Sequence, residues 1–285
     1  MSPAAAKKPS NWLPHAVLIA AVAVFAFPIY ITFVGSSYDS ATIGRGDMPL
    51  WPGSHAFDNY WAAFTGQIGN RLSYTPAARM LVNSLAMAVV IAVGKIAISI
   101  LSAYAVVFFS FPLRMVFFWL IFITLMLPVE VRIIPTYQVV ASLGMVDTYG
   151  GLTIPLIASA TATLLFRQFF LTIPDELMEA SKMDGAGPLR FFWDTLLPLS
   201  RTNMAALFVI LFLYGWNQYL WPLLITTSRS METIVIGITK MIGTGEAQTD
   251  WDLVMATTVM ALVPPVLVVI LMQRWFVKGL VDTEK

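Results

Sequence analysis

Apolar residues in this chain are collected in long runs that alternate with shorter polar segments. A helix needs about 20 mostly apolar residues to cross the hydrocarbon core of a bilayer. Six segments meet this requirement: residues 14–34, 81–109, 115–136, 151–171, 203–225 and 253–275. The pattern therefore predicts an all-α membrane protein with six transmembrane helices, in a single transmembrane domain that spans residues 1–285.

Composition supports this class and excludes several others. The chain is 58% hydrophobic and 12% charged, whereas about a quarter of an ordinary soluble domain is charged. The net charge of +1 does not favour nucleic acid as a partner. The absence of cysteine excludes disulfides and thiolate chemistry. His15 and His55 are too far apart in sequence to form a metal-ligand pattern, so we expect no metal and no cofactor.

The distribution of lysine and arginine predicts the orientation, because these residues concentrate in short cytoplasmic flanks. One side collects Lys7, Lys8, Arg114, Arg167, Lys182, Arg190, Arg201, Arg274, Lys278 and Lys285. The other side has fewer, in longer loops: Arg45, Arg71, Arg79, Arg132, Arg229 and Lys240. We therefore expect both termini in the cytoplasm. The first apolar segment is too long for the apolar region of a signal peptide, so we expect a retained helix.

Two long loops are expected on the outer side, over residues 35–80 and 226–252. They are rich in Gly, Pro, Trp and Tyr, and Trp and Tyr are enriched where a membrane meets water. Two interpretations remain open at this point. The aromatic residues either anchor the chain at the interface or form a partly folded cap that docks an external protein.

Between the fourth and fifth spans, residues 174–187 have the features of a short helix outside the bilayer. Pro174 suits a first turn, and Asp175 and Glu176 follow where the helix dipole favours anions. Gly185 is a good terminator because glycine tolerates the left-handed conformation. One face of the helix presents mostly small or polar side chains that would let another backbone approach: Leu177, Ala180, Ser181 and Asp184.

This segment also carries a recognisable pattern. Glu179-Ala180-Ser181 is followed by Gly185-Ala186, then by Phe192 and by Leu197-Pro198-Leu199. The string resembles the cytoplasmic coupling loop of ABC importer permeases, in which E-A-A precedes a glycine and a later leucine-proline pair. Ser181 replaces the usual second alanine but stays small. The alternative is an amphipathic connector that rests on lipid headgroups.

The likeness extends over nearly the whole chain and is weakest in the first outer loop. It is carried by residues 122–132, 159–163, 166–170, 214–223 and 279–285. The chain resembles binding-protein-dependent ABC permeases of the carbohydrate-uptake class, the relatives of the maltose permease G subunit. Within that class it is most similar to the E-type permease subunits of sn-glycerol-3-phosphate importers. The resemblance implies the type I importer permease fold with a coupling helix.

The resemblance also implies partners and a location. A second, homologous permease would share the pathway, two copies of an ATPase would bind ATP and dock on the coupling loops, and an extracytoplasmic substrate-binding protein would deliver cargo. The chain itself would lie in lipid, in a bacterial inner membrane, and would catalyse no reaction. The coupling loop would span residues 172–202, with contacts to the ATPase from Glu179, Ala180, Ser181, Asp184, Gly185 and Ala186. The implied cargo is sn-glycerol-3-phosphate or glycerophosphodiesters, and the alternative is a sugar such as a disaccharide.

Lys95 lies midway along the second span, where an ionisable group is costly and points to function. Gly94-Lys95 is not part of a nucleotide-binding loop, because Val89 and Ile96 stand where that loop needs Gly and Ser or Thr. The energy source must therefore be another subunit. Lys95 either meets an anionic cargo, pairs locally between helices, or reaches the second permease.

Other polar residues within the spans are candidates for the substrate pathway or for subunit contacts. Glu130 and Arg132 follow Pro128; Glu130 suits an outer gate or a partner salt bridge, and Arg132 is the better candidate for binding phosphate. Asn217 and Gln218 interrupt the fifth span and must find hydrogen-bond partners away from lipid. They line the pathway or join helices.

Two other classes of function are weighed against an ATP-driven permease. A stand-alone channel or ion-coupled carrier would leave the pattern between Glu179 and Pro198 unexplained. A membrane-embedded enzyme would need a nucleophile with its base, a metal cluster or paired carboxylates within the membrane. The sequence presents none of these in a plausible context.

Overall fold

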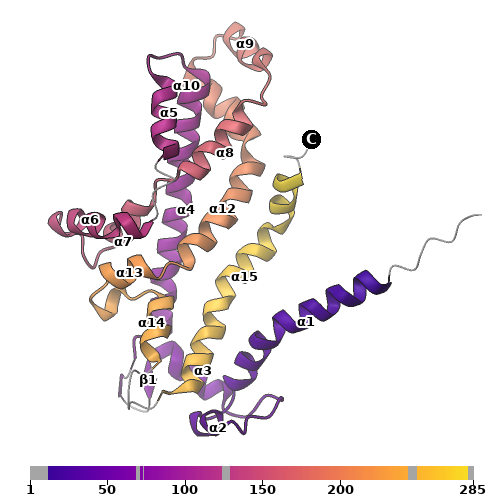
Figure 1. Ribbon diagram of the computed structural model, residues 1–285, viewed down its shortest axis with the longest axis vertical. Helices are drawn as coiled ribbons and strands as arrows, with labels where there is room; N and C mark the ends of the chain where they lie inside the picture. The colour runs from indigo at the N-terminus through magenta and orange to yellow at the C-terminus, as the bar shows by residue number, and fades with distance from the viewer. Residues whose placement is uncertain (1–11, 69–70, 73, 124–128, 243–248, 282–285) are drawn as a thin grey trace, which may run out of the picture. The chain divides into compact units, whose positions relative to one another are not determined.

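The computed structural model describes residues 12–68, 71–72, 74–123, 129–242 and 249–281 of the chain (Figure 1). For residues 68, 71–72, 129–130 and 276–281, only the backbone is described. The chain forms two compact units, Met1–Tyr74 with Met241–Met260, and Thr75–Lys240 with Ala261–Lys285. Helices make up nearly all of the regular structure in the described ranges.

The first unit begins with the long apolar helix α1 (Trp12–Gly35). Helices α2 (Ser40–Arg45) and α3 (Ala56–Thr65) follow, and strands β1 (Gln67–Ile68) and β2 (Arg71–Leu72) pair antiparallel, with Gln67 opposite Leu72. The start of α15 (Trp251–Val281) completes this unit. Buried Asn59 donates to the carbonyls of Ser36 (3.0 Å) and Tyr38 (2.8 Å). The described residues between α1 and β1 are therefore folded rather than an open connection.

The second unit is organised around α4 (Ala77–Phe108), the longest helix described. The elements that follow are α5 (Arg114–Ile123), α6 (Val129–Ser142), α7 (Tyr149–Thr153), η1 (Ile154–Leu156), α8 (Ala160–Phe170), α9 (Asp175–Met183), α10 (Pro188–Phe191), η2 (Phe192–Leu196), α11 (Leu197–Leu199), α12 (Arg201–Trp216), α13 (Leu220–Ile225), η3 (Arg229–Met231) and α14 (Ile234–Met241). Helices α8 and α12 make the most extensive contacts with α4.

Small residues allow α4 and α12 to lie very close together. A Cβ atom built on Gly215 would sit 2.9 Å from the Cα of Ala88. Helices in lipid gain little from the hydrophobic effect, so close backbone packing through Gly and Ala is a main source of their association. Gly215 therefore sets the distance between these two helices.

A buried apolar cluster joins α4 to the shorter elements beside it. Its members are Met87, Ile91, Ile133, Val140, Leu152, Leu156, Trp221 and Ile225. The indole of Trp221 donates to the carbonyl of Gly151 (3.0 Å), which satisfies a polar group inside the cluster. The cluster holds α6, α7 and α13 against one side of α4.

Three described helices are long and apolar enough to cross a membrane: Trp12–Gly35, Ala77–Phe108 and Trp251–Trp275. Two bent pairs raise this number to five, Tyr149–Leu156 with Ala160–Phe170 and Pro188–Leu199 with Arg201–Trp216. These five overlap with five of the six predicted spans, but the pair that overlaps with 203–225 begins at Pro188, inside the predicted coupling loop, and ends at Trp216. The remaining one, 115–136, includes residues 124–128, which lie outside the described residues, so six spans and a single domain remain predictions.

Candidate coupling site

Helix α9 forms where the sequence predicts a short helix between the fourth and fifth spans. It begins at Asp175, directly after Pro174, and both Asp175 and Glu176 lie in its first turn. Lys182 lies in its last turn. The charges at both ends therefore interact favourably with the helix dipole. This interaction stabilises a helix that is too short to be stable alone in water.

The end of α9 is a left-handed glycine turn. Gly185 has a φ of +71°. The amide of Gly185 donates to the carbonyl of Lys182 (3.0 Å), and the amide of Ala186 donates to the carbonyl of Ser181 (3.0 Å). These two bonds form a Schellman motif, which satisfies carbonyls that the last turn leaves without partners. The predicted role of Gly185 as a terminator is confirmed.

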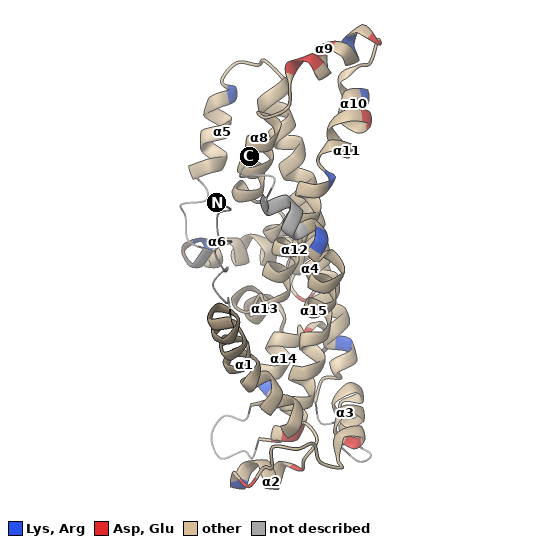
Figure 2. Ribbon diagram, turned by 90° about the vertical axis from the view of Figure 1, so that its right-hand side faces the viewer, with Lys and Arg blue, Asp and Glu red and all other residues tan. Residues whose placement is uncertain are grey.

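None of the residues of α9 is buried. Met183 is 84% exposed, and Leu177 is also exposed although it is apolar. Glu179, Ala180 and Asp184 are exposed as well. Within the second unit, α9 lies at the end away from α14 (Figure 1) and carries both acidic and basic residues (Figure 2). The helix thus presents charged and apolar side chains that this chain does not cover.

The side of α9 that faces this chain lies against the C-terminal end of α4. A cavity of about 100 Å³ lies there, lined by Tyr104, Phe108, Phe109, Met178, Ser181, Lys182, Ala186, Pro188 and Phe191. Ser181 and Ala186 are half-buried, so these two predicted coupling residues line this cavity. The other four, Glu179, Ala180, Asp184 and Gly185, are exposed.

An aromatic cluster forms a joint between α4 and the segment after α9. The Tyr104 hydroxyl donates to the Pro188 carbonyl (2.8 Å). The Tyr104 ring lies 5.2 Å from the Phe192 ring, and the Phe108 ring lies 5.5 Å from the Phe191 ring, between centroids. Such ring pairs stabilise beyond the area they bury. This joint was not predicted from the sequence, although aromatic residues at the end of the second span were a signal.

The return to the next span is strongly bent. Residues Phe192–Leu196 form a π-helical turn, and the helices on either side of Ser200 meet at 70°. Pro198 explains the irregularity, because proline lacks an amide hydrogen and its ring clashes with the carbonyl four residues earlier. The stretch through Pro198 that was predicted to be interfacial is therefore helical, and it is wider than an α-helix only over Phe192–Leu196.

Lys95 is buried in the middle of α4 and only 6% exposed. Its ammonium lies 3.7 Å from the centre of the Tyr214 ring on α12. Among the described residues it makes no ion pair. Arg132 is exposed on α6. The side chain of Glu130, the predicted gate residue, lies outside the described residues.

The amides of Asn217 and Gln218 bond to the end of their own helix. The Asn217 side chain donates to the Leu213 carbonyl (2.9 Å) and the Gln218 side chain to the Tyr214 carbonyl (3.2 Å). Both side chains thus bond within the last turn of α12, where the Leu213 carbonyl also accepts a hydrogen bond from the backbone amide of Asn217 (3.1 Å). This role was not among the alternatives raised by the sequence, and it explains how polar residues are accommodated at the break before α13.

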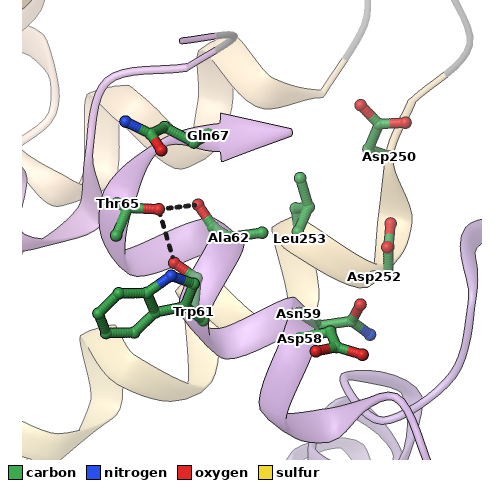
Figure 3. A pocket seen from close by; sticks show the side chains of 9 residues that line it. All are labelled: Asp58, Asn59, Trp61, Ala62, Thr65, Gln67, Asp250, Asp252 and Leu253. Carbon is green, nitrogen blue, oxygen red and sulfur yellow. Dashed lines mark hydrogen bonds between the residues drawn. The ribbon is translucent and has the colours of Figure 1, made fainter. Parts of the chain in front are cut away.

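A second cavity, of about 370 Å³, lies in the first unit between α3 and the start of α15 (Figure 3). Figure 3 shows Trp61, Asp58, Asp250 and Asp252 around it. In the parts of the chain that the structure describes, no group of three or more His, Cys, Asp or Glu could hold a metal ion. The cavity is acidic and therefore unsuited to an anion.

Comparison with known proteins places these features in a family. The family described as "Binding-protein-dependent transport system inner membrane component" matches residues 95–282. The chain is 60% identical to the sn-glycerol-3-phosphate transport system permease protein UgpE of Rhizobium meliloti (strain 1021), over 98% of this chain and 99% of that protein. It is also 60% identical to UgpE of Brucella melitensis biotype 1, over 97% and 98%.

A solved structure shares the fold. The crystal structure of a bacterial ABC transporter involved in the import of the acidic polysaccharide alginate contains a chain that matches with a TM-score of 0.80. The match covers 95% of this chain and 100% of that chain, at 22% sequence identity. The all-α importer permease fold predicted from the sequence is therefore confirmed. Together with the sequence matches, this shows that the chain belongs to the family of binding-protein-dependent transport system inner membrane components.

Proposed function

We propose that this chain is the non-catalytic permease subunit of an ATP-driven importer for sn-glycerol-3-phosphate or glycerophosphodiesters. The observation that carries this proposal is 60% identity, over nearly the full length of both chains, to permeases named for sn-glycerol-3-phosphate transport. The match covers 98% of this chain and 99% of that relative, so it is not confined to one segment.

The proposal assigns different roles to this chain and to three kinds of partner subunit. A second, homologous permease completes the pathway, and a substrate-binding protein delivers cargo from outside. Two copies of an ATPase bind ATP, and one of them docks on α9. The apolar side chains of Met183 and Leu177 support this docking, because both are exposed on a helix that has no buried residue.

The joint at Tyr104 supports a mechanical role for α9 in this scheme. Motion of α9 reaches α4 through the Tyr104–Pro188 hydrogen bond and the packed rings of Phe108 and Phe191. Helix α4 then runs through the centre of the second unit, against α8 and α12. Closure of the ATPase dimer would in this way shift the helices that enclose the pathway.

The test is uptake by the complete complex. We expect vesicles that contain both permeases, the ATPase and the binding protein to accumulate labelled sn-glycerol-3-phosphate only with ATP. A labelled disaccharide serves as the control cargo and should not accumulate. ATP-dependent uptake of the disaccharide but not of the phosphate ester would refute the proposed cargo. Uptake driven by an ion gradient without the ATPase would refute the transport class.

A further inference from the structure

The ammonium of Lys95 has no compensating carboxylate among the described residues. It is 6% exposed and lies in the middle of an apolar helix. A buried charge is strongly disfavoured unless it is paired or meets another suitable group. The Tyr214 ring, 3.7 Å from the ammonium, provides a cation–π contact, but a ring face does not neutralise a full charge.

A second cation acts on the same place. Arg132 adjoins Ile133 on α6, which is buried in one cluster with Ile91 of α4. Tyr214 packs against the same cluster. The charge of Arg132 acts on the Lys95 ammonium as a repulsion. Arg132 is exposed, and no ion pair involves it in the described ranges. Repulsion between these two positive groups from different helices is unfavourable, since neither forms an ion pair with a described carboxylate. An anion between them would remove the repulsion, and in a low-dielectric setting its attraction to both would be strong.

The surrounding helices hold Lys95 and Tyr214 in fixed positions. Gly215 lies directly against the Ala88 backbone, and a Cβ atom on Gly94 would come within 2.8 Å of the Ile157 side chain. Tyr104, in the joint with the segment after α9, lies nine residues further along the same helix as Lys95, or about 14 Å at the usual helical rise. A rigid helix therefore connects the buried ammonium to the coupling segment.

We propose that Lys95, on its Tyr214 platform and assisted by Arg132, is an anion subsite that binds the phosphate group of the cargo during its passage through the permease. The inference rests on the proposed function, since it deepens the assignment of a phosphate-ester cargo. Lys95 supplies a compact charge with three donors, and Arg132 offers a guanidinium that pairs well with phosphate oxygens. The hydroxyl of Tyr214 makes no hydrogen bond within the described residues, so it is available as a further donor.

The first experiment compares Lys95→Met with Lys95→Arg in the complete complex, using labelled sn-glycerol-3-phosphate. Loss of one charge-assisted contact should lower uptake by about tenfold or more in Lys95→Met. Lys95→Arg keeps the charge and should stay within about threefold of the parent complex. Capture of the ATPase by the permease should be the same in both variants as in the parent, which shows that the complex still assembles.

Failure of this inference can be separated from failure of the proposed function. If the parent complex does not transport sn-glycerol-3-phosphate, the proposed cargo is wrong. If the parent transports it and Lys95→Met transports it equally well, only the subsite is wrong. If uptake by Lys95→Met is restored by adding Glu130→Gln, Lys95 serves to neutralise Glu130, and the subsite is again wrong.

A second measurement does not depend on the folding of Lys95→Met. The chain has no cysteine, so Asn217→Cys introduces a single thiol one helical turn beyond Tyr214. A cationic surrounding should make this thiol react at least about threefold faster with a negatively charged thiosulfonate reagent than with a positively charged one, after correction for their intrinsic rates. Saturating inorganic phosphate should reduce the preference. Equal rates, or faster reaction with the positive reagent, would overturn the proposal.

Discussion

At the residue scale, Asp147 joins two segments that are 80 residues apart. Its carboxylate accepts hydrogen bonds from the backbone amides of Thr227 (2.7 Å) and Ser228 (2.9 Å), and from both of their hydroxyls. Burial by itself would raise the pKa of Asp147, but the hydrogen bonds from Ser228 and Thr227 together outweigh it, so the pKa is lowered from the ordinary value of 3.8. The charged form of Asp147 therefore stabilises the contact between its own loop and the loop that contains Thr227 and Ser228.

The lowered pKa of Asp147 predicts how stability depends on pH. A carboxyl group with a lower pKa in the folded state contributes stability above its unfolded pKa of 3.8, and this is lost as pH falls through the lower folded value. Asp147→Asn should therefore have a lower Tm than the parent at pH 7, and the difference should shrink below about pH 4. Asparagine also tolerates the left-handed φ of 57° at this position. Thermal unfolding of the detergent-solubilised parent and variant, at pH 7 and below about pH 4, measures this difference in Tm. A difference that is independent of pH would contradict this account.

At the element scale, α9 depends on its two ends more than on packing. It has nine residues, none of them buried, and isolated helices of fewer than about 12 residues are marginal in water. The acidic first turn and the Schellman motif supply the missing stability, together with the joint to α4 through Tyr104. A surface helix stabilised in this way can be rigid and still leave its outer face uncovered for a partner.

Gly185→Val should therefore disrupt docking without removing the chain from the membrane. A Cβ atom on Gly185 would meet nothing within 4 Å, so the cost comes from the left-handed backbone, at φ +71°, and is about 1–2 kcal/mol. We expect weaker capture of the ATPase and reduced ATP-dependent uptake, with an unchanged amount of chain in membranes. Gly187→Val is the matched control, because Gly187 also has open space and its φ of −72° suits any residue. Equal ATPase capture by both variants would count against the role of this turn.

Not all of the coupling segment could be predicted at this scale. The start of α9 and its end at Gly185 depend on residues within a few positions, so Pro174, Asp175 and Gly185 suffice to locate them. The π-helical turn at Phe192–Leu196 and the 70° bend depend on how Pro198 is accommodated by neighbouring helices. Proline indicates an irregularity in a helix but does not determine its direction.

At the scale of the whole molecule, the chain belongs to a family of inner-membrane transport components, and long apolar helices in both units agree with this. The orientation is a prediction from the distribution of lysine and arginine, which would place the segment 172–202 on the cytoplasmic side. An orientation with α9 inside is also what docking of a cytoplasmic ATPase requires. The side of the membrane on which α9 lies depends on every span before it, because one span more or fewer would place α9 on the opposite side.

The absence of cysteine makes this orientation directly measurable. Met183→Cys places one thiol on α9 at a position that is 84% exposed, and Ser54→Cys places one in the first outer loop. In intact cells, a reagent that does not cross the inner membrane should modify Ser54→Cys and leave Met183→Cys unmodified. In inverted vesicles the result should be reversed. Modification of Met183→Cys in intact cells would show that the orientation is wrong.

The sequence by itself determined the membrane class and both ends of α9, because these follow from the length of apolar runs and from residues close together in the chain. Only the tertiary structure decided that Tyr104 meets Pro188, that Lys95 lies over Tyr214, and that Asn217 and Gln218 bond to the end of α12. The first two contacts join residues about 80 to 120 positions apart. Local periodicity does not specify such pairs, because they depend on how α4 packs against its neighbours.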